Sequence, residues 1–181
     1  MLNKKDTRQI LVESLIELSQ TKPIEKISVC DIVRNCGAGR QTFYNHFKDK
    51  YDLINWFYNS TVDNIIEQYK DKGPWADVIG LTISFIYEYR KFFGNVISEE
   101  GQESFFNAFY EHTKHFYTEY VRSNYGEAAL TEELLFDIKF NCHGAVCMDK
   151  EWLKSGMKEP PTVIGTRIAN AMPQSLKKYF E

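Results

Sequence analysis

Apolar residues recur every three or four positions along most of the chain, which is the periodicity of an amphipathic α-helix. In the first such segment Leu11, Leu15 and Leu18 fall on one helical face, and Asp6 can cap the helix at its start. The alternation of apolar and polar residues that marks a β-strand does not recur. The pattern therefore predicts an all-α fold that begins with a helix over residues 6–20.

Turn-forming residues divide the rest of the chain into seven further predicted helices. Two short helices, at residues 28–36 and 40–47, follow one another with only Gly37-Ala38-Gly39 between them. Asp49 can cap the long helix that comes next. The remaining predicted ranges are 50–70, 75–93, 102–123, 131–154 and 161–180, with breaks at Gly94-Asn95, Gly126 and Gly156 and a break or kink at Pro173.

Charge is distributed unevenly between the two parts of the chain. Residues 1–50 carry nine Lys or Arg and six Asp or Glu, a net charge of +3, whereas the remainder carries −6. A basic module joined to an acidic body is typical of a nucleic-acid reader with a second domain, although solvated surface charge gives the same numbers. We expect a DNA-binding domain at 1–50 and a helical body at 51–181, joined by the helix 50–70.

Composition excludes several classes of protein. A chain of 181 residues, 43% of them hydrophobic, buries enough surface to fold without disulfides or a structural metal. The four cysteines lack CxxC spacing, and the start Met-Leu-Asn-Lys-Lys has no apolar signal run. No stretch approaches the roughly 20 apolar residues of a membrane span. We therefore expect a cytoplasmic protein that does not bind a membrane.

The two short helices have the spacing of a helix-turn-helix. At about 100° per residue, Phe43 and Phe47 fall on one side of the second helix, where they would anchor it to the core. The opposite side carries uncharged hydrogen-bonding side chains, namely Gln41, Asn45, Thr42 and Tyr44. Amide groups pair with the edge of adenine through two hydrogen bonds, and a Thr methyl can touch a thymine methyl. This face is therefore a candidate reader of base edges.

Further side chains near this face suit the phosphate backbone. Arg40 at the helix start can reach a guanine or a phosphate. The candidates for phosphate contacts are His46, Lys48, Lys50 and the hydroxyl of Tyr44. Two amphipathic helices that simply pack in an all-α domain, with their polar residues outward, explain the same pattern about equally well.

Residues 27–53 resemble the DNA-binding signature of the TetR family of transcriptional regulators. The positions that match, in register and without gaps, are Val29, Ile32, Gly37, Thr42, Tyr44, His46, Phe47, Lys50 and Leu53. The resemblance implies an N-terminal three-helix DNA-binding domain followed by a helical ligand-binding and dimerisation domain. It also implies DNA contacts by Thr42, Tyr44, His46 and Lys50, with Ser28 as a helix cap that contacts phosphate.

The chain departs from the family signature at several positions. Gly39 replaces a Ser that caps the recognition helix, and Gln41 replaces a common Gly, so the operator sequence cannot be inferred from the family. Residues 40–45, together with Trp56, are similar to a subgroup that includes regulators of dihydroxyacetone kinase operons. The resemblance covers the first 55 to 60 residues.

The family resemblance implies a homodimer that reads a palindromic operator, with a small molecule in the body that releases repression. Two recognition helices about 34–36 Å apart would then enter successive major grooves. One alternative is a transcriptional co-activator that works with a partner protein or ligand. Another is a helical ligand-binding protein that has lost DNA binding.

Aromatic residues are concentrated in residues 85–125, where they form either a packed core or a cavity for an apolar or aromatic effector. The candidate pocket residues are Phe105, Phe109, Tyr110 and His143. Small residues in the last two helices permit close helix approach, either at a dimer interface or within the chain. They are Gly144, Ala145, Gly165, Ala169 and Ala171.

Motifs for catalysis or metal binding are weak. His112 and His115 lie at i, i+3 and Cys142 and Cys147 at i, i+5, but exposed polar residues and buried small residues explain these spacings at least as well. The chain contains no GxSxG, phosphate-loop or His-Glu-x-x-His pattern. We therefore expect neither an enzyme nor a bound cofactor or metal.

Overall fold

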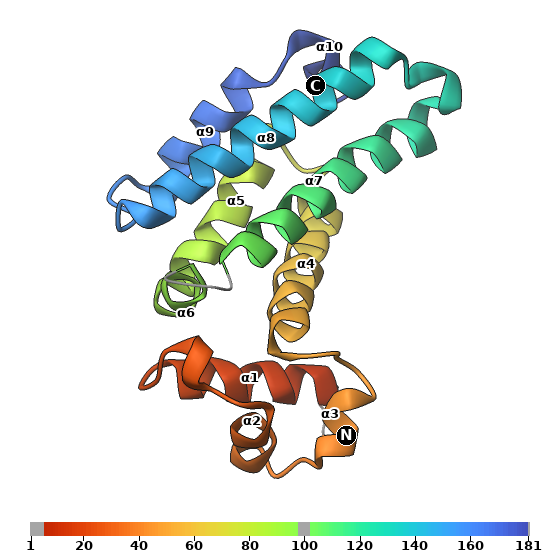
Figure 1. Cartoon of the computed structure of the whole chain (residues 1–181). Helices are drawn as coiled ribbons and strands as arrows, with labels where there is room; N and C mark the ends of the chain where they lie inside the picture. Colours follow the sequence, from red (N-terminus) through yellow and green to blue (C-terminus); the bar gives the residue numbers. More distant parts are fainter. Residues whose placement is uncertain (1–5, 98–101, 181) are drawn as a thin grey trace.

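Four helical segments form the N-terminal end of the molecule (Figure 1). They are α1 (Thr7–Ser19), the 3₁₀ turn η1 (Ile24–Lys26), α2 (Val29–Asn35) and α3 (Arg40–Tyr44). In this computed structural model, which describes residues 6–97 and 102–180, every regular element is helical, and the predicted fold class is confirmed. Helix α1 lies between the body and the pair α2 and α3, so α2 and α3 occupy the far end of the molecule (Figure 1).

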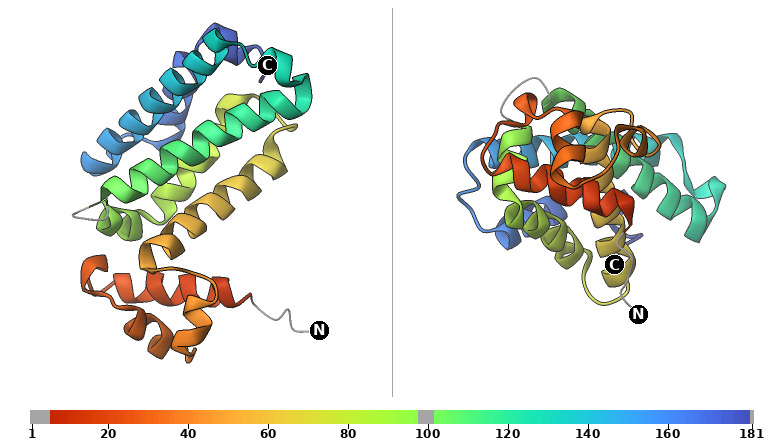
Figure 2. Two further views of the ribbon diagram at one scale, coloured as in Figure 1. Left: turned by 45° about the vertical axis from the view of Figure 1, so that its right-hand side comes forward. Right: turned by 90° about the horizontal axis from the view of Figure 1, so that it is seen from below.

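Helix α4 leads from this end into the body, which contains the remaining elements. They are α4 (Lys50–Tyr69), α5 (Trp75–Glu88), α6 (Arg90–Val96), α7 (Gln102–Tyr125), η2 (Glu127–Ala129), α8 (Glu132–Lys154), α9 (Pro161–Ala171) and α10 (Gln174–Lys177). Helices α5 and α7 lie between α4 on one side and α8 with α9 on the other (Figure 2). Among the described residues, no helix is long and apolar enough to cross a bilayer.

Three helix starts follow directly from local side-chain chemistry. The Asp6 carboxylate accepts the Arg8 backbone N–H at 3.1 Å, and the Asp49 carboxylate accepts the N–H groups that follow it at 2.8 and 2.9 Å. Ser28 and Asp31 form a complete capping box at the start of α2. Each of these caps satisfies backbone donors that a helix leaves unpaired, so the predicted starts of α1, α2 and α4 are confirmed.

The predicted helix 75–93 is two helices in the structure. The break lies at Tyr89, where ψ is 29°, and α6 continues through Gly94, which had the stronger sequence signal for a break. The bend carries α6 across the end of the body, where Phe92 and Phe93 are fully buried and lie within 6.3 Å of the Phe57 ring. Burial of aromatic area here outweighs the local preference of glycine for a helix end.

Of two other predicted helix boundaries, one is wrong and one is confirmed. Helix α3 ends at Tyr44 instead of continuing to residue 47, because the His46 N–H bonds the Phe43 carbonyl in a tight turn. At the other end of the chain, α9 ends at Ala171 and Pro173 separates it from α10, as predicted.

Helices α5 and α9 approach each other through two glycines. A Cβ built on Gly165 would lie 2.7 Å from the Gly80 Cα, closer than any packed Cβ, so position 165 requires the absence of a side chain. Ala169, one turn further along α9, is also buried within the chain. For Gly165 and Ala169 the structure therefore supports packing within the chain, the alternative to a dimer contact.

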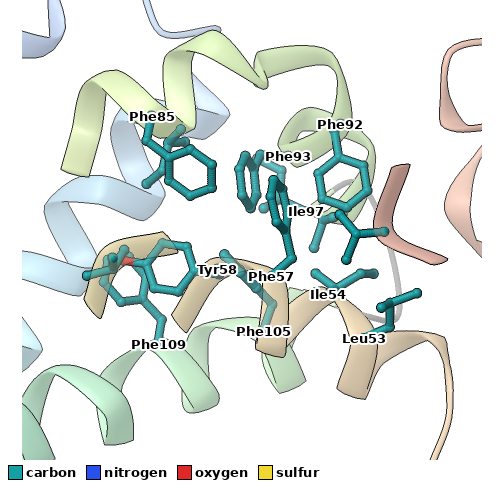
Figure 3. Close-up of a cluster of buried hydrophobic side chains, with 14 of the residues drawn as sticks. Leu53, Ile54, Phe57, Tyr58, Phe85, Phe92, Phe93, Ile97, Phe105 and Phe109 are labelled. Carbon is teal, nitrogen blue, oxygen red and sulfur yellow. The ribbon is translucent and has the colours of Figure 1, made fainter. Parts of the chain in front are cut away.

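A cluster of aromatic rings joins α4, α5, α6 and α7 (Figure 3). The Phe57 ring meets the rings of Phe85 and Tyr89 edge-on at 5.3 and 5.2 Å. The next residue, Tyr58, packs against Phe105 and Phe109 at 5.5 and 4.7 Å. Adjacent residues of α4 thus contact α5 with α6 on one side and α7 on the other.

Candidate nucleic-acid interface

The turn between α2 and α3 depends on one glycine. Gly37 has φ +69° and follows the last residues of α2, where the Ala38 N–H bonds the Val33 carbonyl at 2.8 Å and the Gly37 N–H bonds the Arg34 carbonyl. This pair of bonds is a Schellman motif, whose left-handed residue is commonly glycine. The motif ends α2 and sets the direction in which α3 leaves it.

Helix α3 is held by the two rings that the periodicity singled out. Phe43 is 0% exposed and Phe47 3% exposed, and their centroids lie 5.9 Å apart. Phe47 also contacts Trp56 of α4 at 5.7 Å. Five residues are too few to form a stable helix alone, so these ring contacts fix the position of α3.

The opposite face of α3 is open to solvent. Gln41 and Asn45 are exposed, Tyr44 is 48% exposed and Thr42 is half-buried. The Gln41 side-chain amide donates to the Asn45 amide oxygen at 3.0 Å. Because each amide offers two donors and an oxygen with two lone pairs, this bond orients both side chains and leaves them able to pair with base edges.

Exposed groups surround this face on several sides. The predicted contacts that lie in solvent are Ser28, Arg40, His46 and Lys48. The Ser28 hydroxyl accepts the Asp31 N–H at 3.1 Å. The Asp31 carboxylate accepts the Ser28 backbone N–H at 2.9 Å and the Ser28 hydroxyl at 2.8 Å, and these two bonds hold the pKa of that carboxyl below its ordinary value. Ser28 is therefore the helix cap that the family resemblance implies.

Lys50 is placed differently from the other candidates. Its ammonium donates to the carbonyl oxygens of Ile24, Glu25 and Ile27 at 2.7, 2.9 and 2.9 Å, which uses all three of its donors. Partial burial lowers the pKa of Lys50. The side chain thus ties the start of α4 to η1, a role that its position in the sequence does not signal. Contact with a phosphate requires the ammonium to give up one of these bonds.

Both parts of the chain match models of known protein families. Residues 11–55 match the family model described as bacterial regulatory proteins, tetR family. Residues 74–174, more than half of the chain, match the model for the C-terminal region of such transcriptional regulators. The chain belongs to the TetR family of transcriptional regulators.

Individual relatives of this TetR-family regulator are distant. The activator of the dhaKLM operon of Lactococcus lactis, DhaS, is 27% identical over 101 residues, which are 55% of this chain and 54% of DhaS. An HTH-type regulator of Staphylococcus aureus strain MRSA252 is 26% identical over 129 residues, 66% of this chain and 70% of that protein. The chain thus spans about half the length of the first relative.

The solved structure described as the dihydroxyacetone kinase operon activator DhaS shares the fold. It superposes with a TM-score of 0.68 at 19% identity and covers 97% of this chain and 98% of its own. The similarity therefore extends over the body as well as the DNA-binding end.

The four predicted pocket residues of this TetR-family regulator do not meet in one pocket. Phe109 lines an internal cavity, but Phe105 is packed within the aromatic cluster (Figure 3). Tyr110 stacks on His143 at 4.1 Å, and His143 lines a separate hollow between α8 and α9. Residues three or four apart share a face of α7 whereas neighbours do not, which explains why Phe109 and Tyr110 separate.

The cavity has a volume of about 70 Å³ and lies among α4, α5, α7, α8 and α9. Its polar lining includes side chains that are not among the four predicted pocket residues, namely Tyr58, His112, Tyr117 and Asp149. Asp149 had a signal in the sequence, because it continues the face of α8 that carries the buried residues Ile138, Cys142 and Val146. A carboxylate on an apolar face is an unusual placement and marks a candidate site.

Within the described ranges, the candidate metal ligands His112, His115, Cys142 and Cys147 do not come together in one cluster. Residues 6–97 and 102–180 contain no group of three or more His, Cys, Asp or Glu able to hold a metal ion. His112 bonds Asp63 of α4 at 2.9 Å. All four cysteines are free thiols, and burial raises the pKa of Cys142 to about 12.

Proposed function

We propose that this TetR-family regulator binds a palindromic operator as a homodimer, with α3 of each subunit in a major groove. The observation that carries the proposal is the uncharged polar face of α3, which is presented at the end of the molecule away from the body (Figure 1). We place the protein in the cytoplasm, where a bacterial operator is accessible, and assign it a binding role instead of a catalytic one.

The proposed contacts divide into two kinds. Gln41, Asn45 and Thr42 read base edges, because their amides and methyl group match the major-groove pattern. The remaining groups fix the register on the DNA through phosphates, with Arg40 also able to reach a guanine. These are Ser28, Arg40, Tyr44, His46, Lys48 and Lys50.

Dimerisation is proposed through the outer face of α8 and α9. Phe136 and Phe140 are 66% and 64% exposed and stack on one another, and Met148 of α8 and Val163 of α9 are further exposed apolar side chains. Such a surface is costly in water and suits a self-complementary contact about a two-fold axis. A two-fold dimer presents two copies of α3 to two half-sites.

Ligand control is proposed through α4. Leu53 and Ile54, at its start, are buried beneath the DNA-binding helices, whereas Val62 and Ile66 line the cavity. The aromatic cluster around Phe57 lies between these two ends (Figure 3). A ligand that favours one position of α4 therefore changes the placement of α3, provided that its affinity differs between the two positions.

The direction of control has two candidates. In the first, ligand binding releases repression. In the second, the chain activates transcription together with a ligand or partner protein, and this is favoured by the similarity to DhaS, a transcriptional activator of the dhaKLM operon. Transcription in a purified system with operator DNA distinguishes them, because the free protein lowers transcript yield in the first and does not in the second.

Selection of bound sequences from random duplex DNA tests the proposal, with the stoichiometry of each complex measured in parallel. Recovery of an inverted repeat bound by one or more dimers is expected. Recovery of no sequence by folded dimeric protein would overturn it. That result would favour a ligand-binding protein that has lost DNA binding.

A further inference from the structure

Asp149 is a buried carboxylate without a compensating partner. It lies on α8, is 5% exposed, and its Oδ1 atom has no hydrogen bond. No ion pair involves it among the residues that the structure describes. Burial of a carboxyl group in this state is unfavourable and raises its pKa to about 8.

The surroundings of Asp149 are those of a binding cavity. Asp149 lines the cavity of about 70 Å³, together with aliphatic side chains and the aromatic rings of Tyr58, Phe109, Phe116 and Tyr117. The Tyr58 and Phe109 rings lie 4.7 Å apart at one wall (Figure 3). An anionic group beside several aromatic rings suits a cation, because the faces of aromatic rings attract positive charge.

Two other polar side chains around the cavity already have partners. His112 Nε2 bonds the Asp63 carboxylate at 2.9 Å, and the Tyr117 hydroxyl accepts the Trp75 indole N–H at 3.1 Å. Tyr58 of α4 and Asp149 of α8 line the same cavity, and the pKa of Tyr58 is raised chiefly by burial and further by the Asp149 charge. A ligand bound to Asp149 therefore also touches α4.

We propose that this cavity binds a short alkylammonium ion, with the ammonium on the Asp149 carboxylate and the alkyl chain against the aromatic rings. The alkyl chain is short because the cavity volume is about half of the roughly 150 Å³ that holds the six carbon atoms of benzene, which corresponds to about three carbon atoms. The proposal deepens the ligand control proposed above and rests on it for its regulatory meaning.

Binding of the cation requires the ionised carboxylate. Below about pH 8 the free protein holds a proton on Asp149, so the ammonium must displace that proton as it binds. Affinity is therefore expected to rise about tenfold per pH unit toward pH 8, and then to level off. Tyr58 of α4 and His112 and Tyr117 of α7 face the same cavity and are unchanged in an Asp149 variant, so a slope that is lost in the variant belongs to Asp149.

Isothermal titration of the full chain with n-propylammonium chloride tests the inference. The neutral probe 1-propanol has the same number of heavy atoms and serves as the matched ligand. Asp149→Asn serves as the matched protein, because its amide has the shape of the carboxyl and carries no charge. The expected result is that the variant loses propylammonium affinity at least tenfold at pH 8, loses the pH slope, and keeps its melting temperature or raises it.

Two results would overturn the inference. One is equal affinity of wild type and Asp149→Asn for propylammonium, and the other is propanol binding to wild type as tightly as the ammonium. Operator affinity is measured separately on the selected DNA. Operator binding by a protein that does not bind propylammonium overturns the inference and leaves the DNA-binding proposal standing. Binding of propylammonium without a change in operator affinity supports the cavity inference and overturns ligand control through this cavity.

Discussion

At the scale of the residue, the amide pair on α3 is the proposed basis for sequence preference. We expect Gln41→Ala and Asn45→Ala each to reduce discrimination at one base position by about 1–3 kcal/mol, because each removes a potential pair of hydrogen bonds. Competition between operator variants in a binding assay measures this. Gln68→Ala is the matched control, since Gln68 makes the same amide bond, to Asn64 at 3.0 Å, on the exposed side of α4. An unchanged operator preference in both α3 variants would contradict the assignment.

Lys50 is expected to affect stability as well as DNA affinity. Lys50→Ala leaves the carbonyls of Ile24, Glu25 and Ile27 without their donor, and losing hydrogen bonds to a charged group lowers the free energy of unfolding by about 1.5–3 kcal/mol. Urea denaturation measures this loss. Lys26→Ala, on the same turn but exposed, is the control and should change it by less than about 0.5 kcal/mol. A loss of DNA affinity at wild-type stability would instead identify Lys50 as a phosphate ligand alone.

Asp149 makes stability depend on pH in a defined direction. Its pKa is about 8 in the folded protein, against an ordinary value of 3.8, so the folded state binds the proton more tightly. Below about pH 4 the group is protonated in both states and has no effect. As pH rises from 4 to 8 the unfolded state alone gains by ionising, so this group lowers stability progressively.

Asp149→Asn removes this effect. Its melting temperature relative to wild type is expected to increase from pH 5 to pH 8, as thermal melts at each pH would show. A constant difference across this range would contradict the assignment of a proton to buried Asp149.

At the scale of the element, three glycines are expected to respond differently to alanine. Gly37→Ala places a side chain at φ +69° and should destabilise by about 1–2 kcal/mol, although no atom lies within 4 Å. Gly165→Ala should destabilise through contact with the Gly80 backbone at 2.7 Å. Gly94→Ala, within α6 and in open space, should stabilise by about 0.5–1 kcal/mol. Chemical denaturation measures the free energy of unfolding of the three variants. A stabilised Gly37→Ala would contradict the turn geometry.

Local chemistry determines which elements the sequence could predict. The side chains of the caps Asp6, Ser28 and Asp49 bond backbone groups within three residues, so the starts of α1, α2 and α4 could be predicted from the sequence. The anchored side of α3 was readable for a similar reason, because Phe43 and Phe47 are one turn apart. The exposed candidates on α3 follow from the same periodicity.

Features that depend on contacts between residues far apart in the sequence could not be predicted from it. The break at Tyr89 depends on Phe57, more than thirty residues earlier, and the partners of Lys50 are backbone carbonyls more than twenty residues earlier, which no side chain indicates. The cavity brings five helices together, so a choice of aromatic residues by density included Phe109, which lines the cavity, but grouped it with Phe105, Tyr110 and His143, which do not.

At the scale of the whole molecule, the exposed apolar face of α8 is expected to hold two copies together. Phe136→Glu combined with Phe140→Glu introduces charge at positions 66% and 64% exposed, so the fold should survive while the dimer dissociates. Light scattering after size-exclusion chromatography measures the mass. Tyr69→Glu, exposed on α4, is the control and should leave the dimer intact. A variant that stays dimeric would place the interface elsewhere.

The length of α4 gives it the geometry of a lever. Its 20 residues span about 30 Å, so a tilt of about 5° around its cavity end moves its other end by about 2.6 Å. In the proposed two-fold dimer the two subunits would move in opposite senses, so their α3 helices would shift by about 5 Å relative to each other, more than the 3.4 Å rise of one base pair. A displacement at the cavity smaller than a bond length would thus be amplified into a mismatch of about one base pair between the two α3 helices and the operator.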